Sequence, residues 1–234
     1  VEDELKGYKL VGTLPITSDY ISGVEFGVNL SDRSKKKRQP EGPLEANGTP
    51  TISSDLLYSP VDLGFSGSGT IPSWNVPGVV AKYFQPFNPS ELNPGAISRA
   101  WDVKEKITTS FVKADIDAQL GSVSLRGNIG VQVQNTDQSS ASAYVDNSAG
   151  GAVKPVSGGT TYTDVLPSMN LVFGLADQQT IRVGAAQQIA RARIDQLRSS
   201  FDFHLSSTTL RPSGNGGNPK LDPWRANAFD ISYE

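Results

Sequence analysis

The 234-residue chain carries 21 Lys and Arg against 24 Asp and Glu, and 37% of its residues are hydrophobic. The small negative charge gives no indication of nucleic-acid binding, and the absence of Cys excludes disulfide scaffolds, thiolate metal sites and cysteine catalysis. No segment approaches the roughly 18 apolar residues of a membrane-spanning helix, but a mean hydropathy of −0.31 is compatible with a transmembrane β-barrel, whose strands need apolar residues only at alternate positions.

Alternation of apolar and polar residues predicts seven strands. In chain order they are Leu5–Val11, Ile21–Ser31, Val103–Leu120, Ser122–Gln134, Tyr162–Leu175, Thr180–Arg191 and Asn227–Glu234. In Ser122–Gln134, one face carries Leu125 and Val131 and the other carries Arg126 and Asn128. Within Val103–Leu120 the apolar residues change parity near Phe111, which predicts a β-bulge at that point.

The links between these strands are alternately short and long. Leu120-Gly121 and Ala176-Asp177-Gln178 are tight, whereas the segments 32–101, 135–161 and 192–226 are long. Outer-membrane barrels have this arrangement, with short periplasmic turns and long extracellular loops. The pattern therefore predicts an all-β fold, part of an antiparallel up-and-down transmembrane β-barrel with long extracellular loops. The alternative is a secreted β-sandwich with inserted loops.

The sequence gives little indication of a catalytic site. The one histidine, His204, lies in the third long loop, and no other residues around it suggest a catalytic base. We therefore expect no catalytic site, no metal site and no cofactor.

Two sets of residues are candidates for ligand binding. The first consists of aromatic residues in and after the first long loop: Trp74, Tyr83, Phe84, Phe87 and Trp101. They could stack on a ligand, close a small loop core or lie in an interfacial girdle, for which Trp101 is the best candidate. The second set consists of polar residues on the lumen face of the strands: Arg126, Asn128, Arg182 and Gln188. These could contact a ligand or form hydrogen bonds with a plug.

A basic run, Lys35-Lys36-Lys37-Arg38, directly follows the second predicted strand. It is either a solvated loop or a contact for the anionic phosphates of lipopolysaccharide on a bacterial surface.

Several motifs resemble one family. They are Leu125-Arg126-Gly127-Asn128-Ile129-Gly130-Val131, then Leu166-Pro167-Ser168-Met169-Asn170-Leu171, and the most distinctive, Gly217-Asn218-Pro219-Lys220-Leu221-Asp222-Pro223. In this order they are similar to the C-terminal barrel portion of TonB-dependent outer-membrane receptors, especially the branch found in Caulobacter- and Xanthomonas-like bacteria.

This resemblance implies a receptor in the bacterial outer membrane, with a 22-stranded barrel, an N-terminal plug domain and a coupling box that contacts an inner-membrane energy-coupling complex. We expect residues 1–234 to form a partial β-barrel domain of such a receptor, without the plug domain and the coupling box. Its partners would be an imported small-molecule ligand, either an iron chelate or a carbohydrate, together with outer-membrane lipid, lipopolysaccharide and the plug. The alternative from another functional class is a secreted β-rich carbohydrate-binding module.

Overall fold

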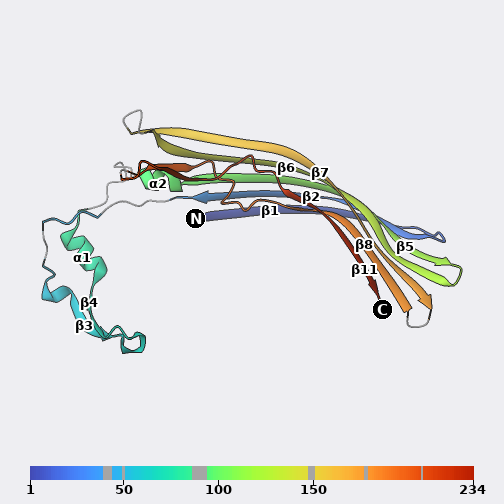
Figure 1. Cartoon of the computed structure of the whole chain (residues 1–234), viewed down its shortest axis with the longest axis horizontal. Coiled ribbons are helices and arrows are strands. Elements are labelled where there is room, and N and C mark those ends of the chain that lie inside the picture. The colour runs from blue at the N-terminus through green and yellow to red at the C-terminus, as the bar shows by residue number, and fades with distance from the viewer. Residues whose placement is uncertain (39–43, 49–50, 86–93, 147–150, 177–178, 207) are drawn as a thin grey trace. The chain divides into compact units, whose positions relative to one another are not determined.

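The computed structural model describes residues 1–38, 44–48, 51–85, 94–146, 151–176, 179–206 and 208–234. The chain forms two compact units, Val1–Arg38 with Ile97–Glu234, and Gln39–Ala96. The first unit contains a long β-sheet, which is built from the strands predicted from the sequence (Figure 1). The second unit is an insert between two strands of this sheet.

Within the described residues, seven strands pair into one antiparallel sheet, in the order in which they occur along the chain. They are β1 (Glu2–Pro15), β2 (Ile21–Lys37), β5 (Trp101–Leu120), β6 (Val123–Asp146), β7 (Ala152–Ala176), β8 (Gln179–Ala190) and β11 (Trp224–Tyr233). The predicted all-β, up-and-down arrangement is confirmed. The tight turn after Leu120 is also confirmed, and Gly121 adopts a φ of +63° there, which glycine accepts without a steric penalty. Residues 177–178 of the other predicted tight turn lie outside the described residues.

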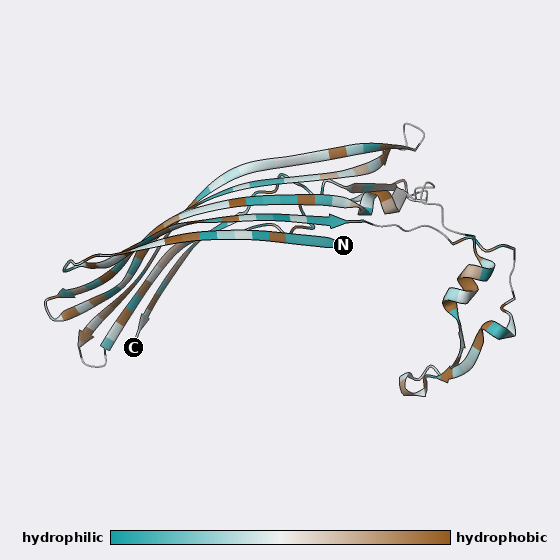
Figure 2. Ribbon diagram, turned by 180° about the vertical axis from the view of Figure 1, so that it is seen from behind, coloured by the Kyte–Doolittle hydropathy of each residue, from teal (hydrophilic) through white to brown (hydrophobic). Residues whose placement is uncertain are grey.

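The register gives the sheet two faces, which we call outer and inner. Ile129 on β6 is opposite Ala114 on β5 and Met169 on β7, so these three share the outer face. Asn128, its neighbour in sequence, is opposite Asp115 and Asn170 on the inner face. Figure 2 shows the resulting alternation of hydrophobic and hydrophilic residues along the strands.

The outer face carries an apolar band that none of the described residues covers. Its large hydrophobic side chains stay exposed: Leu10, Leu14, Phe26, Val112, Ile129, Val133, Val165, Phe229 and Ile231. On β6 the band extends from Leu125 to Val133, about nine residues, close to the roughly 9–11 that a tilted transmembrane strand needs. A water-soluble protein rarely exposes so large a contiguous apolar surface.

Several strands continue far beyond this band at the end that carries the long connections, which we call the loop end. β6 and β7 have 24 and 25 residues and pair from Ser124/Gly174 to Asp146/Ala152. The prediction of a long loop over 135–161 is therefore wrong for most of its length. Residues 135–142 of β6 are polar or small on both faces, so alternation disappears there although the pairing with β7 continues.

The same extension changes the position of the basic run. Lys35, Lys36 and Lys37 lie in β2 rather than in a loop, so the loop prediction is wrong for them. Successive residues of a strand point to opposite faces, and the register places Lys36 opposite Asp102 on the outer face and Lys35 opposite Val103 on the inner face. The run is thus divided between the two faces and does not form one cluster.

The predicted β-bulge at Phe111 is also wrong. β5 pairs continuously with β6 from Trp101/Ser142 to Leu120/Val123, without a shift of register. What changes along β5 is the face that is apolar. Val112, Ala114 and Ile116 face outward in the band, whereas Trp101 and Val103 at the loop end face inward. The parity change marks the place where the strand leaves the apolar band.

The insert between β2 and β5 has its own elements. Its strands β3 (Leu57–Asp62) and β4 (Thr70–Trp74) form a hairpin, with 3-10 turns at Ser54–Leu56 and Gly64–Ser66. Helix α1 (Val76–Tyr83) is capped by the Asn75 side chain, which accepts a hydrogen bond from the Gly78 amide at 3.0 Å. A short helix α2 (Pro94–Arg99) precedes β5. Among the described residues, the helices are all too short to cross a membrane.

Candidate functional site

The inner face at the loop end is covered by the segment that joins β8 to β11. This segment, residues 191–223, contains the hairpin of β9 (Phe201–Leu205) and β10 (Pro212–Gly216). Two of its side chains, Ile194 and Leu197, pack with Trp101 and Val103 of β5, and this group is the buried hydrophobic cluster of the described sheet unit. Each fully buried aliphatic side chain stabilises such a contact by about 1.5–3 kcal/mol. The segment therefore lies on the inner face and does not extend freely outward.

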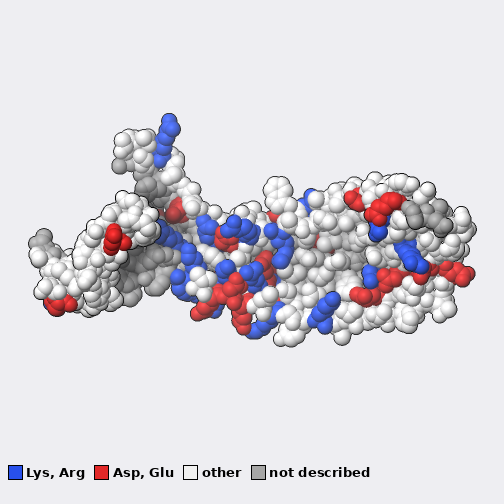
Figure 3. Space-filling model, turned by 90° about the horizontal axis from the view of Figure 1, so that it is seen from below, with Lys and Arg blue, Asp and Glu red and all other residues white. Residues whose placement is uncertain are grey.

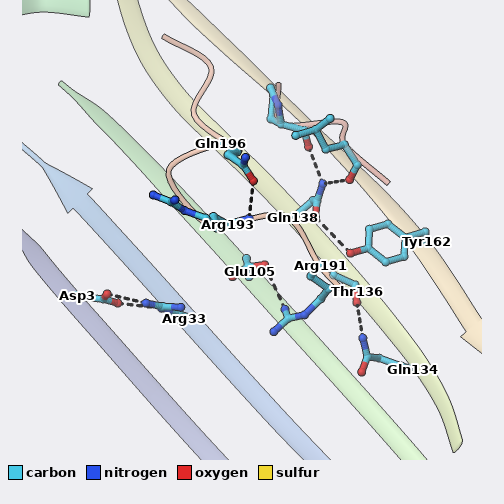
Figure 4. A network of polar contacts seen from close by, with 12 residues as sticks. Asp3, Arg33, Glu105, Gln134, Thr136, Gln138, Tyr162, Arg191, Arg193 and Gln196 are labelled. Atoms are coloured by element: carbon cyan, nitrogen blue, oxygen red, sulfur yellow. Dashed lines mark hydrogen bonds and ion pairs between the residues drawn. The ribbon is translucent and has the colours of Figure 1, made fainter. Parts of the chain in front are cut away.

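Gln138 holds the returning part of this segment. Its side-chain Nε2 donates hydrogen bonds to the carbonyl oxygens of Pro219 at 3.0 Å and Leu221 at 2.8 Å (Figure 4). The Tyr162 hydroxyl donates to Gln138 Oε1 at 3.4 Å, and burial raises the pKa of Tyr162, which keeps the hydroxyl protonated. Gln138 is only 2% exposed. One buried amide thus joins two neighbouring strands to the segment.

Two buried carboxylates hold the ends of the segment. Glu105 accepts a hydrogen bond from Arg191, directly after β8, at 3.1 Å. Asp164 accepts one from Arg225, near the start of β11, at 2.5 Å. Both carboxylate side chains are almost fully buried, and a buried carboxylate needs such a partner because its desolvation is costly. Each arginine therefore neutralises an acid on the inner face.

The hydroxyl of Ser140 forms a further connection. It donates to the carbonyl oxygen of Asp102 at 2.8 Å and accepts a hydrogen bond from the Ser199 amide, also at 2.8 Å. Ser199 in turn donates through its hydroxyl to the carbonyl oxygen of Val156 at 3.3 Å. The segment is thus tied to β5, β6 and β7 near the start of β9.

Charged side chains beside this covered region are also paired. Arg33 donates two hydrogen bonds to Asp3, at 3.0 and 2.7 Å, and Lys35 lies 3.3 Å from the same carboxylate. These two cations hold the pKa of Asp3 down at about 2. On the face drawn in Figure 3, positive and negative side chains are interspersed. The region presents no extended field of one sign.

The Gly217–Pro223 motif has a structural role in the return of the segment. The Asn218 amide donates to the carbonyl oxygen of Gln196 at 2.8 Å, and the Asn218 side chain accepts from the Lys220 amide at 2.9 Å. A Cβ atom on Gly217 would lie 2.6 Å from the Gln196 carbonyl oxygen and still closer to that of Arg198. Only glycine fits between these backbone atoms.

We therefore expect Gly217→Ala to lower the free energy of unfolding by about 1–3 kcal/mol, the usual cost of overpacking. Thermal unfolding in detergent, followed by the change in electrophoretic mobility of the folded form, measures this loss. Gly7→Ala is the control, because the nearest atom to its new Cβ would be the Leu30 carbonyl oxygen at 3.9 Å. Equal melting temperatures for the two variants would contradict the tight fit at Gly217.

The structure corrects the prediction for Trp101. It is the first residue of β5, lies on the inner face and is only 6% exposed, packed with Ile194 and Leu197. A girdle residue needs an outward-facing ring at the membrane interface, so the girdle prediction is wrong. The same burial leaves its indole no surface for a ligand.

The other aromatic candidates lie in the insert. Trp74 ends β4 and is 38% exposed, whereas Tyr83 ends α1 and Phe84 follows it, both half-buried. The Tyr83 hydroxyl donates to Ser53 Oγ at 3.0 Å and accepts from the Ser53 amide at 3.1 Å. Phe87 lies outside the described residues. Ligand binding by this set stays a prediction.

The polar candidates of the strands share the inner face, as the alternation predicts. Arg126 lies 3.5 Å from Asp117, and Arg182 lies 3.4 Å from Glu234, in exposed ion pairs. The other two, Asn128 and Gln188, follow the same parity. Contact of these four residues with a ligand stays a prediction.

The sequence analysis missed the residues that hold the covering segment. Gln138 lies in the predicted loop 135–161, and Asp164 lies in the predicted strand Tyr162–Leu175, where the local pattern gives no sign of an arginine partner. The hairpin was missed as well, although Phe201-Asp202-Phe203-His204-Leu205 alternates with a period of two, which is a strand signal. Tyr144, near the end of β6, lies in the predicted loop 135–161, and its ring stacks on that of Phe201.

The arrangement offers surfaces for binding rather than groups for catalysis. Among the side chains that the structure describes, no group of three or more His, Asp or Glu is placed to hold a metal ion. The two buried carboxylates, Glu105 and Asp164, are each engaged in an ion pair with an arginine.

Comparison with known proteins gives one finding. A family model described as "TonB dependent receptor-like, beta-barrel" matches residues 9–234. Neither a search of curated proteins nor a search of solved structures returned a match.

Proposed function

The chain belongs to the TonB-dependent receptor-like β-barrel family, and we propose on this basis that it forms the ligand-facing wall of a receptor for a scarce solute. Barrels of this family lie in the bacterial outer membrane, and they transport solutes with energy coupling rather than catalyse reactions. The finer proposal is that the solute is an iron chelate or a carbohydrate, which the loop end captures and the inner face passes inward.

The observation that carries this proposal is the contrast between the two faces of the sheet. The outer face has an exposed apolar band about nine residues tall, which suits contact with lipid. The inner face of β6 is polar over the same height and carries Arg126, Asn128 and Gln132. A wall between lipid and a hydrated path needs this division.

The proposal includes the partners that the family resemblance implies. They are the plug domain inside the barrel, the inner-membrane energy-coupling complex, and lipid with lipopolysaccharide around the outer face. Assignment to the Caulobacter- and Xanthomonas-type branch rests on the motifs of the sequence analysis, above all Gly217–Pro223. Trp74, Tyr83, Phe84, Arg126, Asn128, Arg182 and Gln188 stay proposed ligand contacts.

Uptake by whole cells tests this function. Cells that produce the receptor are given a radiolabelled ferric chelate or a labelled oligosaccharide, and accumulation is compared with that of cells lacking it. We expect accumulation that a protonophore abolishes, while binding at the cell surface remains. Accumulation of neither class of solute, or accumulation that is unchanged by the protonophore, would contradict energy-coupled import.

A further inference from the structure

An aromatic surface lies at the loop end, where the β9–β10 hairpin meets β6. The rings of Tyr144 and Phe201 stack with their centroids 4.8 Å apart and their planes at 29°. Phe203 lies two residues further along β9, on the same face of that strand as Phe201. Phe201 is 42% exposed and Phe203 is 62% exposed. We call these three side chains the aromatic platform.

The platform stands on a firmly held backbone. Asp202 Oδ1 accepts a hydrogen bond from the Asn215 amide across the hairpin at 3.0 Å, and Asn215 Oδ1 accepts one from Arg198 at 2.8 Å. Ser200, the residue before β9, is fully buried, and the Ser199 amide is bound to β6. Exposed phenylalanine rings contribute little to folding. Rings held in fixed positions suit ligand binding, because a preorganised surface loses little entropy when a ligand binds.

The charges around the platform cancel. Lys154, the cross-strand neighbour of Tyr144, lies 2.5 Å from the Asp146 carboxylate, and Arg193 lies 2.9 Å from that of Asp195. The hairpin itself, residues 201–216, carries one acidic and one basic side chain, Asp202 and Arg211. An anionic iron chelate would be favoured by an excess of positive charge, which these side chains do not provide.

From these observations we infer that the aromatic platform binds a neutral carbohydrate, with a sugar ring stacked on Phe201 and Phe203. The apolar face of a pyranose ring covers an exposed aromatic ring, and neighbouring carboxylate and amide oxygens accept hydrogen bonds from its hydroxyls. This inference rests on the proposed function, since it selects one of the two solute classes and locates its contact.

Equilibrium binding to the receptor, produced in the outer membrane of a bacterial host and purified in detergent, tests the inference. Fluorescently labelled maltohexaose, cellohexaose and xylohexaose are the probes. We expect at least one to bind, and Phe203→Ala to weaken it about tenfold, within the range for loss of a stacking ring. Phe203→Tyr keeps the ring and should stay within about threefold of the unmodified receptor.

Phe65→Ala is the matched control, because this phenylalanine is 89% exposed and lies in the insert rather than on the platform. If Phe203→Ala retains sugar binding, or if Phe65→Ala loses as much affinity for the sugar as Phe203→Ala does, the sugar does not bind to the aromatic platform. Binding of a ferric tricatecholate without binding of any of the three oligosaccharides would overturn the choice of carbohydrate. Binding at equilibrium needs no energy source, so a receptor that binds sugar without importing it contradicts the proposed transport and leaves the platform supported.

Discussion

Replacing Ile129 with arginine should destabilise the protein in a lipid bilayer by about 2–4 kcal/mol, the cost of an arginine on the lipid-facing side near the midplane of a membrane barrel. Ile129 lies at the middle of the apolar band, opposite Ala114 and Met169, and is 48% exposed on the outer face. The guanidinium would have to lose its hydration or distort the bilayer around it. The free energy of unfolding from liposomes, measured by urea titration, gives the loss directly.

The matched control is Gln132→Arg. Gln132 lies on the same strand three residues away, opposite Phe111 and Leu166 on the inner face, where an arginine stays hydrated. We expect this variant to change the free energy of unfolding by less than about 1 kcal/mol, as is typical of substitutions outside packed sites. Equal losses for the two variants would contradict the assignment of the outer face to lipid.

Replacing Gln138 with leucine should release the segment 191–223 from the inner face. Leucine has a similar volume but removes both hydrogen bonds to the carbonyl oxygens of Pro219 and Leu221, which would then be buried without this partner. At about 1–3 kcal/mol for an unsatisfied buried group, we expect a loss of about 2–3 kcal/mol in docking of the segment. This corresponds to roughly a 30- to 150-fold larger population of the undocked state.

Limited digestion with trypsin measures that population, because cleavage of an opened segment follows the fraction that is open. The segment offers Lys220 and Arg198 as cleavage sites. Gln134→Leu is the control, since Gln134 lies on the same face of β6 and makes a 3.4 Å hydrogen bond to Thr136 but none to the segment. If the Gln138→Leu protein resists trypsin as well as the control does, the hydrogen bonds from Gln138 are not needed to dock the segment.

Much of the sheet could be predicted from local pattern alone. The seven strands, their order and the faces of Ile129 and Asn128 follow from alternation, because the preference of each residue for lipid or for water repeats every two residues. The family resemblance likewise follows from motifs within single strands and one return segment.

The candidate site was harder to predict from sequence. Trp101 looks like an interfacial residue because it stands at a strand start, yet its neighbours Ile194 and Leu197 come from a segment about 90 residues later in the chain. The apparent bulge at Phe111 arose for a related reason. Trp101 and Val103 on the inner face of β5 are covered by that distant segment, and no local sequence pattern indicates such a cover.

The sequence by itself therefore determined the fold class, the number and order of the strands in the long sheet and the face that meets lipid, since each depends on residues close together in the chain. Only the tertiary structure decided how far the strands rise beyond the apolar band and where the segment 191–223 lies. Backbone pairing of β6 with β7 continues where the alternation of apolar and polar residues has ended. The hydrogen bond from Gln138 to Pro219 joins residues that are 81 positions apart in the chain. Contacts between residues so far apart in the chain depend on the packing of the whole sheet. This packing places the segment 191–223, predicted as an outward loop, on the inner face.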